Sequence, residues 1–333
     1  MTTDTLYDYA VIGAGIAGAS VAYRLSAAAS VAVLEREAQP GYHSTGRSAA
    51  MFMETYGTPQ IKALTRASRA FYEQPPQGFA DHPLLHPRGV LYIATPEQRD
   101  LLHDVFDDFR RQSPNVTLID ADQAVARVPC LRGDQLCGAI EEPDARDIDV
   151  HALHQGFLRG MARQGAVLRN QAELTAASFD DGIWTLTLAG GATLRARVVV
   201  NAAGAWADQT AAQCGARPVG LQPCRRTAFT FAGPADVDFS HWPAVVGVDE
   251  SYYFKPDAGQ LLGSPANADP VAAHDVMPEE LDVATGIYRI EAATSMTIRR
   301  PRHTWAGLRS FVRDGDFVAV SYTHLTLPTI YSV

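Results

Sequence analysis

Three glycines and one glutamate near the N-terminus have the types and spacing that suit recognition of a dinucleotide. Gly13, Gly15 and Gly18 follow the apolar segment 9–12 in the pattern GxGxxG, and Glu35 stands 20 residues after the second glycine. The first glycine permits a tight turn, the second lets the backbone approach a pyrophosphate, and the third lets a helix pack on the preceding strand. The glutamate carboxylate can accept hydrogen bonds from a ribose diol.

The segments around these residues predict the elements that must position them. Residues 9–12 and 31–34 are apolar, as in buried strands, and the alanine-rich segment from Ile16 predicts a helix between them. The N–H groups at the start of that helix would form an anion site. The full order of strand, glycines, helix, strand and acid predicts a dinucleotide site. The alternative is a structural turn followed by a surface glutamate, and the motif alone does not distinguish NAD from FAD.

The rest of the chain alternates helical and strand patterns. Helices are predicted over 58–73, 96–111 and 151–164, and strands over 89–94, from 165 to 200, and from 226 to 263 with a hairpin around 256–259. This order predicts an α/β fold in which a Rossmann-like nucleotide-binding domain, made of separated pieces, carries an inserted antiparallel-sheet substrate domain. The predicted nucleotide-binding domain comprises 1–85, 145–222 and 298–320, and the predicted substrate domain comprises 86–144 and 223–297.

Composition narrows the class of protein. The chain has 333 residues and a net charge of −9 without a basic cluster, which argues against a nucleic-acid partner. It has no apolar run long enough to span a bilayer and no signal-peptide pattern at its start, so we expect a cytoplasmic protein without a transmembrane segment. The cysteines at 130, 137, 214 and 224 form no CxxC pair, and no HExxH motif occurs. We therefore predict reduced thiols and no metal site.

Four longer stretches carry a resemblance to a known family. They are LEREAQPGYHSTGRSAAMF at 34–52, VVVNAAGAWAD at 198–208, LGSPANADPVAAHD at 262–275 and TIRRPRHTWAGLRSFVRDGD at 297–316. Together they resemble the FAD-dependent D-amino-acid dehydrogenases and oxidases, the superfamily that includes glycine oxidase and sarcosine oxidase. The resemblance extends from residue 8 to about residue 320 and is closest to the bacterial D-arginine dehydrogenases within this family.

The resemblance implies FAD as the cofactor and assigns residues to its parts. Besides the three glycines, the implied cofactor-binding residues are Ala17, Glu35, Arg36, Ser44, Thr45, Gly46, Arg47, Ser48, Ala49, Ala50, Met51, Glu173, Gly204 and Trp206. Ala17, Glu35 and Arg36 would hold the adenosine end, and 44–51 would wrap the pyrophosphate and the flavin. Glu173 would touch the adenine through its backbone, and residues 204–206 would close the other side.

The same resemblance implies a substrate site. Arg309 would clamp the substrate carboxylate, since a guanidinium can bind it with two parallel hydrogen bonds. Arg226 would line the pocket, and the hydroxyls of Tyr56 and Tyr253 would orient the amine or the carboxylate. The implied reaction is oxidation of a D-amino acid to a 2-oxo acid and ammonia, by hydride transfer from Cα to flavin N5. A quinone or another acceptor would then take the electrons.

Two positions depart from the D-arginine dehydrogenase pattern. Met51 stands where that pattern has a histidine, and Val90 stands where it has a glutamate that holds a basic side chain. A guanidinium without that carboxylate would lie unpaired against an apolar strand, which is unfavourable. We therefore expect a weakened preference for D-arginine and D-lysine and a neutral or apolar D-amino acid as substrate. A glycine- or sarcosine-type amine oxidase remains an alternative.

The last segment, 321–333, differs from the rest of the chain. It reads SYTHLTLPTIYSV, without a glycine or an acidic or strongly basic residue. The resemblance implies a glycine-rich loop and a final helix at this point, which would close the FAD-binding domain. We expect 321–333 to be a non-native tail on a truncated chain, with a genuine terminal strand as the alternative. A truncated, non-catalytic fragment is the corresponding alternative for function.

Overall fold

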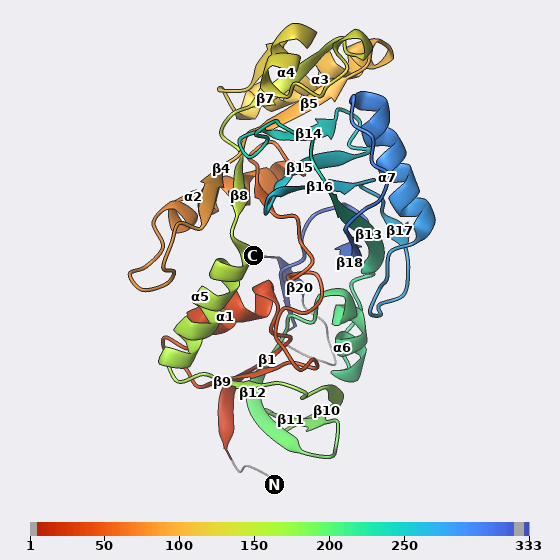
Figure 1. Ribbon diagram of the computed structural model, residues 1–333. Helices are drawn as coiled ribbons and strands as arrows, with labels where there is room; N and C mark the ends of the chain where they lie inside the picture. The colour runs from red at the N-terminus through yellow and green to blue at the C-terminus, as the bar shows by residue number, and fades with distance from the viewer. Residues whose placement is uncertain (1–4, 323–329, 333) are drawn as a thin grey trace.

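A six-stranded sheet carries the glycine motif, in the lower half of the molecule in Figure 1. The computed structural model describes residues 5–322 and 330–332. The strands of this sheet are β1 (Leu6–Ile12), β2 (Val31–Leu34), β9 (Val167–Arg169), β10 (Leu174–Asp180), β11 (Ile183–Leu188) and β12 (Thr193–Asn201). Their order is β10-β11-β12-β1-β2-β9. Strands β12, β1, β2 and β9 run parallel, whereas β10 and β11 add an antiparallel meander.

Strands β1 and β2 are apolar because their side chains are covered on both faces of the sheet. Val11 and Val33 have no exposed surface and belong to a core that also contains residues of α1 (Ile16–Leu25) and α5 (Val150–Arg163). Parallel strands covered on both sides are expected to be continuously hydrophobic rather than alternating. This explains why β1 and β2 were recognisable in the sequence.

A nine-stranded sheet forms the other large layer, in the upper half of Figure 1. Its strands are β5 (Val90–Ala94), β6 (Thr117–Ile119), β7 (Gly138–Glu142), β13 (Gln222–Phe231), β14 (Ala244–Gly247), β15 (Tyr253–Asp257), β16 (Gln260–Ser264), β17 (Asp269–Pro270) and β18 (His303–Phe311). The order is β17-β13-β16-β15-β14-β5-β7-β6, and β18 pairs with the other side of β13. Strands β15 and β16 form the predicted hairpin.

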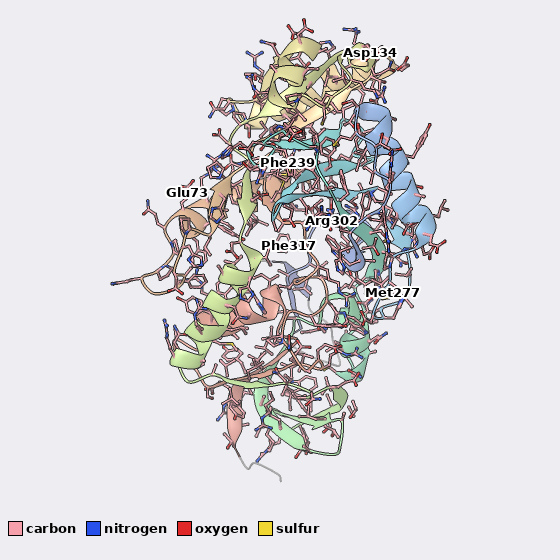
Figure 2. The ribbon with its side chains drawn as sticks, viewed as in Figure 1. Glu73, Asp134, Phe239, Met277, Arg302 and Phe317 are labelled. Atoms are coloured by element: carbon pink, nitrogen blue, oxygen red, sulfur yellow. The ribbon has the colours of Figure 1, made fainter. Side chains whose placement is uncertain are left out.

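Helices flank this second sheet. They are α3 (Arg99–Gln112), α4 (Ala121–Arg127) and α7 (Glu280–Ala293). Ile290 of α7 packs into a core with Phe229 and Phe254 of the sheet. Figure 2 labels Met277 at the edge of the molecule below α7, and it is 71% exposed.

Shorter elements connect the two sheets. Strands β3 (Met51–Phe52), β4 (Leu85–Pro87) and β8 (Arg146–Ile148) form a three-stranded sheet, and α2 (Pro59–Glu73) and α6 (Ala207–Gln213) lie beside the two large layers. Single 3₁₀ turns occur at Pro96–Gln98, Gly133–Gln135 and Gly204–Trp206. Thr58 caps α2 by accepting a hydrogen bond from the N–H of Ile61, and a proline follows at the first helical position, so the predicted helix start is explained.

The mixed α/β architecture confirms the predicted fold class. The division into domains remains a prediction. Segment 298–320 belongs to the predicted nucleotide-binding domain, whereas β18 within this segment is hydrogen-bonded to β13 of the larger sheet. Of the tail 321–333, residues 323–329 and 333 lie outside the described residues, and the described remainder contributes to β19 (Val320–Tyr322) and β20 (Ile330–Ser332).

The structure also bears on membrane-spanning helices, metal sites and disulfides. In the part of the chain that the structure describes, no helix is long and apolar enough to cross a bilayer. Within the same residues, no group of three or more histidine, cysteine, aspartate or glutamate side chains is arranged to hold a metal ion. All four cysteines are free thiols.

Candidate functional site

The glycine motif forms one wall of a small cavity at the end of β1. This cavity, the dinucleotide cavity below, has a volume of about 140 Å³. It is lined by nine of the predicted cofactor residues: Gly13, Gly15, Glu35, Arg36, Ser44, Thr45, Glu173, Gly204 and Trp206. Residues from four separate segments of the sequence thus meet at the carboxyl ends of β1, β2 and β12, where ligands bind in open α/β sheets.

Each glycine of the motif has its own geometric reason. Gly13 has φ of +96°, which favours glycine, and a Cβ there would lie 2.5 Å from the carbonyl oxygen of Ala202. A Cβ on Gly18 would lie 1.8 Å from the carbonyl oxygen of Gly13. Gly15 is the N-cap of α1, which has no side-chain cap and no acidic residue in its first turn. The positive end of the helix therefore faces the cavity without a competing anion from its own first turn.

Glu35 holds the turn together from the end of β2. It is 7% exposed, and its two carboxylate oxygens accept the backbone N–H groups of Ala14 at 2.8 Å and Glu37 at 2.9 Å. A carboxylate has about four acceptor positions, so these two bonds leave capacity for a ligand hydroxyl. The predicted ribose contact is therefore compatible with a structural role that the sequence had not indicated.

An aromatic and cationic cluster forms the far side of the dinucleotide cavity. The guanidinium of Arg36 lies 4.9 Å from the ring centre of Trp206 and 3.4 Å from a carboxylate oxygen of Glu173. The ring of His43 packs against Trp206 at a centroid distance of 4.6 Å, and its Nε2 contacts Glu37 at 2.9 Å. A flat, cation-backed indole suits an aromatic base. His43 lines this cavity as well.

The loop 44–51 is tied to β18 and separates the dinucleotide cavity from a second one. Ser44 donates a hydrogen bond to the carbonyl of Leu308 at 2.6 Å, and Arg47 donates to the carbonyl of Ala306 at 3.0 Å. Trp305 in turn donates from its indole nitrogen to the carbonyl of Arg47 at 3.1 Å. The Arg47 guanidinium also contacts Asp275, so protein atoms already occupy several of its donors.

A second cavity of about 470 Å³, the substrate cavity below, lies on the other side of this loop. It brings together the four predicted substrate residues Tyr56, Arg226, Tyr253 and Arg309. The predicted cofactor residues Ser44, Arg47, Ser48, Ala49, Ala50 and Met51 line it as well. Residues 48–50 contribute only small side chains to this lining.

The register of β13 and β18 explains why the two arginines meet. Arg226 of β13 lies directly opposite Gly307 of β18, and Arg309 lies two residues after Gly307 on β18. Diagonal neighbours of this kind point to the same face of a sheet and are within reach of each other. The glycine at 307 also makes room for the loop, because a Cβ there would lie 3.3 Å from the Cβ of Arg47.

The charges in the substrate cavity favour an anionic ligand. Burial, followed by the charge of Arg309, lowers the pKa of Arg226, while Tyr253, Tyr56 and Glu250 act in the opposite direction. The two positively charged guanidinium groups repel each other, and a carboxylate bound between them would reduce this repulsion. Arg309 donates a short hydrogen bond to the hydroxyl of Tyr56, and burial raises the pKa of Tyr253, which keeps its phenol protonated.

Three of the predicted cofactor residues line neither of these cavities. Ala17 is exposed in the first turn of α1, and Gly18 is buried under it. Gly46 shapes the loop, with its N–H bonded to the carbonyl of Gly41 at 2.8 Å. Val90, predicted to face the substrate, is completely buried and does not line the substrate cavity.

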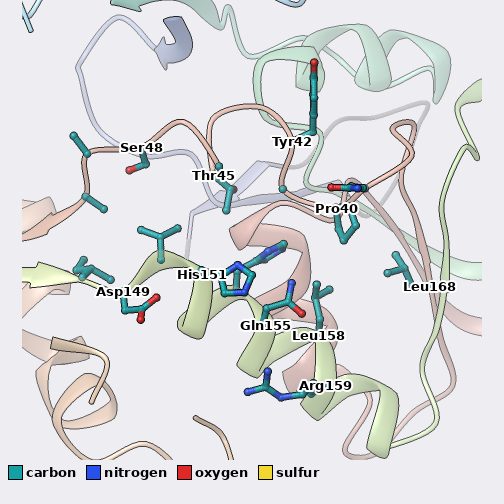
Figure 3. A pocket seen from close by; sticks show the side chains of 18 of the residues that line it. Pro40, Tyr42, Thr45, Ser48, Asp149, His151, Gln155, Leu158, Arg159 and Leu168 are labelled. Atoms are coloured by element: carbon teal, nitrogen blue, oxygen red, sulfur yellow. The ribbon is translucent and has the colours of Figure 1, made fainter. Parts of the chain in front are cut away.

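A larger cleft of about 950 Å³ lies behind the same loop, between it and α5. Figure 3 shows His151 and Gln155 of α5 on the opposite side of this cleft from Thr45 and Ser48 of the loop. None of the four predicted substrate residues lines this cleft. Its size therefore does not make it the better candidate for the reaction.

The structure adds residues that the sequence had not indicated. Glu250 lines the substrate cavity with φ of +54°, an uncommon conformation for a residue other than glycine. Lys255 lines it too and forms a 2.6 Å ion pair with Asp147. Tyr92 of β5 also contributes to the wall. No motif marks these residues, because only strand pairing brings them to the cavity.

Comparison with known proteins places the chain in a family. The model of the family described as FAD dependent oxidoreductase matches residues 8–328, and the chain belongs to this family. Mitochondrial dimethylglycine dehydrogenase of Rattus norvegicus is 25% identical over 271 residues, which is 77% of this chain and 30% of that protein. The chain therefore spans less than a third of that relative.

Two other proteins are similar over nearly the whole chain. Glycine oxidase of Geobacillus kaustophilus is 23% identical over 323 residues, 93% of this chain and 82% of that protein, and its crystal structure superposes with a TM-score of 0.79. That structural match covers 93% of this chain and 84% of the other. L-proline dehydrogenase of P. horikoshii superposes with a TM-score of 0.81 at 18% identity, over 96% and 85% of the two chains. These similarities confirm the fold, while the likeness to D-arginine dehydrogenase remains a prediction.

The family is one of FAD-binding flavoproteins, and the observed residues fit this cofactor. Gly204 has φ of +56°, and a Cβ built on it meets no atom within 4 Å, so the wall of the dinucleotide cavity is open there. The start of α1, where the N-cap is a glycine and the N–H of Ile16 bonds to the Thr45 hydroxyl at 3.0 Å, suits a pyrophosphate. The small side chains of 48–50 suit a flat ring system. The predicted cofactor, FAD, is thus confirmed.

Proposed function

We propose that the protein oxidises a D-amino acid to a 2-oxo acid and ammonia. The observation that carries this proposal is the meeting of two arginines and two tyrosines in a cavity that shares a wall with the proposed flavin loop. When bound, FAD accepts the hydride that leaves Cα. The resulting imino acid reacts with water, which replaces the nitrogen by oxygen and releases ammonia. Family membership supports an FAD-dependent amine oxidoreductase, and the D-amino acid is our more specific inference.

We assign a role to each of the four predicted substrate residues. Arg309 binds the substrate carboxylate through two N–H groups, and the Tyr56 hydroxyl, bonded to that guanidinium, fixes its orientation. Arg226 adds a second positive charge, and its Nε is held by the carbonyl of Asn267. Tyr253 encloses the substrate and offers its phenol as a donor. Together these groups hold Cα at one place and one orientation, which is the main contribution a protein makes to such a reaction.

The dinucleotide cavity supplies the matching roles for the cofactor. Glu35 binds the ribose hydroxyls of the adenosine, and the start of α1 at Gly15 binds the pyrophosphate. Arg36 and Trp206 enclose the adenine, and Glu173 contacts it through its backbone. The segment 44–51 passes from the pyrophosphate to the flavin ring, since it lines both cavities.

The side chain of the substrate is proposed to be neutral. Met51 and Val246 give the substrate cavity an apolar part, and no acidic residue stands at position 90. Glu250 is the acidic residue of this cavity among the described residues, and it acts on Arg226. A basic side chain on the substrate would compete with Arg226 for the Glu250 carboxylate. D-alanine, D-leucine or D-methionine are therefore better candidates than D-arginine.

A second candidate is the oxidation of glycine or an N-methylated glycine. The similarity to glycine oxidase over 93% of the chain and to dimethylglycine dehydrogenase supports it. Such substrates share the carboxylate and the amine but lack a side chain. The same arginine clamp serves both candidates, so the side-chain pocket distinguishes them. A quinone or another organic acceptor is proposed to reoxidise the flavin.

Anaerobic flavin reduction tests the proposal directly. The purified protein is loaded with FAD, and its visible spectrum is followed after addition of D-amino acids, their L-enantiomers, glycine or sarcosine. We expect neutral D-amino acids to bleach the flavin bands faster than all the others. Fastest reduction by glycine or sarcosine would support the second candidate, and preferred reduction by an L-amino acid or by D-arginine would contradict the assignment of the side-chain pocket. Oxygen uptake with and without a quinone then identifies the acceptor.

A further inference from the structure

A buried carboxylate outside the predicted site lies behind the substrate cavity. Glu142 on β7 is 2% exposed and lies directly across from Val90 of β5. Residues directly opposite in an antiparallel pair point to the same face. The carboxylate that is missing at position 90 therefore has a counterpart on the neighbouring strand.

Hydrogen bonds from a short segment hold this carboxylate. Thr55 donates its hydroxyl to Glu142 at 2.6 Å, and the backbone groups of Glu54 and Thr55 also bond to it. Burial raises the pKa of Glu142, and these hydrogen bonds act against that rise. We take Glu142 as ionised, the form in which both of its oxygens accept hydrogen bonds.

The chain of hydrogen bonds has a fixed direction. An ionised carboxylate only accepts, and the hydroxyl of a threonine has a single proton. Because Thr55 gives that proton to Glu142, its oxygen must accept from the hydroxyl of Tyr92, which lies 3.3 Å away. The Tyr92 hydroxyl then uses its proton in the hydrogen bond to Thr55. Its oxygen can still accept a hydrogen bond from a further partner, but the hydroxyl cannot donate one. Tyr92 is 1% exposed and lines the substrate cavity.

An amino acid bound in this cavity needs an acceptor for its amine. Glu250, which also lines the cavity, is one such acceptor, and its charge acts on Arg226. Arg226 and Arg309 only donate, and the Tyr56 hydroxyl accepts from Arg309. Tyr253 is hydrogen-bonded to Ser264. An amine or ammonium group beside the clamped carboxylate requires an oxygen that accepts, and Tyr92 is the hydroxyl that a buried carboxylate orients in this sense.

We propose that Tyr92, oriented through Thr55 by Glu142, is the amine-recognition subsite of the substrate cavity. Tyr92 accepts a hydrogen bond from the substrate nitrogen, while Glu142 and Thr55 are positioning residues that do not touch the substrate. The ligand class is a primary or secondary amine next to a carboxylate. This inference rests on the proposed function, since it assumes that the carboxylate is bound by Arg309.

Two ligands of nearly equal shape isolate the amine contact. 2-Aminoisobutyrate carries an amine and a carboxylate but no Cα hydrogen, so it cannot be oxidised. Pivalate replaces its amine by a methyl group. Calorimetric titration of both into the FAD-loaded protein gives one Kd that includes the amine and one that does not.

The variants Tyr92→Phe and Thr55→Val remove the acceptor or its orientation with little change in volume. We expect either variant to raise the Kd of 2-aminoisobutyrate at least about 10-fold, the usual effect of losing a hydrogen bond to a charged group. The Kd of pivalate should change less than twofold. Thr55→Ser keeps the hydroxyl and should restore binding. Tyr252→Phe, a largely buried tyrosine that does not line the substrate cavity, is the matched control.

The outcomes separate this inference from the proposed function. Equal weakening of both ligands, or unchanged binding of 2-aminoisobutyrate in Tyr92→Phe, would overturn the amine subsite while wild-type flavin reduction by amino acids still stands. A wild-type protein whose flavin no amine reduces and which binds neither ligand would overturn both. Selective loss of 2-aminoisobutyrate binding, with rescue by Thr55→Ser, is the supporting result.

Discussion

Replacing Gly18 by alanine should separate α1 from β1 and thereby release the cofactor. An alanine Cβ at this position would lie 1.8 Å from the carbonyl oxygen of Gly13 and 2.9 Å from its carbonyl carbon. Real Cβ contacts are essentially never shorter than 3.0 Å, so the helix must move by about 1.2 Å. The obstacle is backbone, which cannot rotate away as a flexible side chain could.

The expected magnitude combines two opposing contributions. Overpacking costs about 1 to 3 kcal/mol, and the rigid obstacle favours the upper end. Alanine is the better helix former by about 1 kcal/mol, which offsets part of this cost. We therefore expect Gly18→Ala to lower the free energy of unfolding by about 2 kcal/mol. Because Gly13 and the start of α1 line the dinucleotide cavity, FAD should be lost as well.

Urea unfolding followed by tryptophan fluorescence measures the first effect, and absorbance of the purified protein measures bound FAD. Gly182→Ala is the control without a clash, since alanine would gain backbone strain at φ of +78° but its Cβ would meet no atom within 4 Å. It should cost about 1 kcal/mol and leave FAD bound. A Gly18→Ala protein with full FAD content and a stability equal to that of the control would refute the reasoning.

Three further predictions follow from single contacts. Arg309→Met should lower kcat/KM for a D-amino acid about 100-fold, because a charge-assisted carboxylate contact is lost; a change below threefold in stopped-flow flavin reduction would contradict the clamp. Burial lowers the pKa of His154 from 6.5, and its Nε2 lies 2.8 Å from the carbonyl oxygen of Ala14. The unfolded chain then binds this proton more readily than the folded chain does. The free energy of unfolding should therefore fall as the pH drops below 6.5, by at most about 1.4 kcal/mol per pH unit. His154→Gln should reduce this pH dependence, measured by urea unfolding at pH 7 and pH 5.5. Arg225→Met should destabilise the fold by about 3 kcal/mol, because it leaves Asp282, 2.8 Å from the Arg225 Nε, without its cation; an unchanged thermal midpoint would contradict this.

Local sequence was sufficient for the first βαβ unit. The glycine spacing, the apolar strands and Glu35 lie within 35 residues, and each is explained by a backbone requirement of its immediate neighbours. The same holds for α2, whose start at Thr58 and Pro59 depends on capping within one turn. Interactions of this range leave a readable pattern in a single chain.

The substrate site depended on family resemblance for its residues and on the tertiary structure for its geometry. Arg226 and Arg309 are 83 residues apart, and nothing local makes them neighbours. The register of β13 and β18, which places Arg226 opposite Gly307, brings both guanidinium groups to one face. A shift of that register by one residue would turn one arginine to the other face.

Glu142 illustrates what the sequence by itself left undetermined. Position 90 carries valine, and from this we expected no carboxylate to hold a basic side chain of the substrate. Pairing of β5 with β7 places Glu142 on the same rung, and the segment after β3 supplies Thr55 as its partner. Sequence determined which groups exist and which short elements they occupy, because periodicity and capping are local. Strand order and register decided which groups meet, because these depend on packing between residues far apart in the chain.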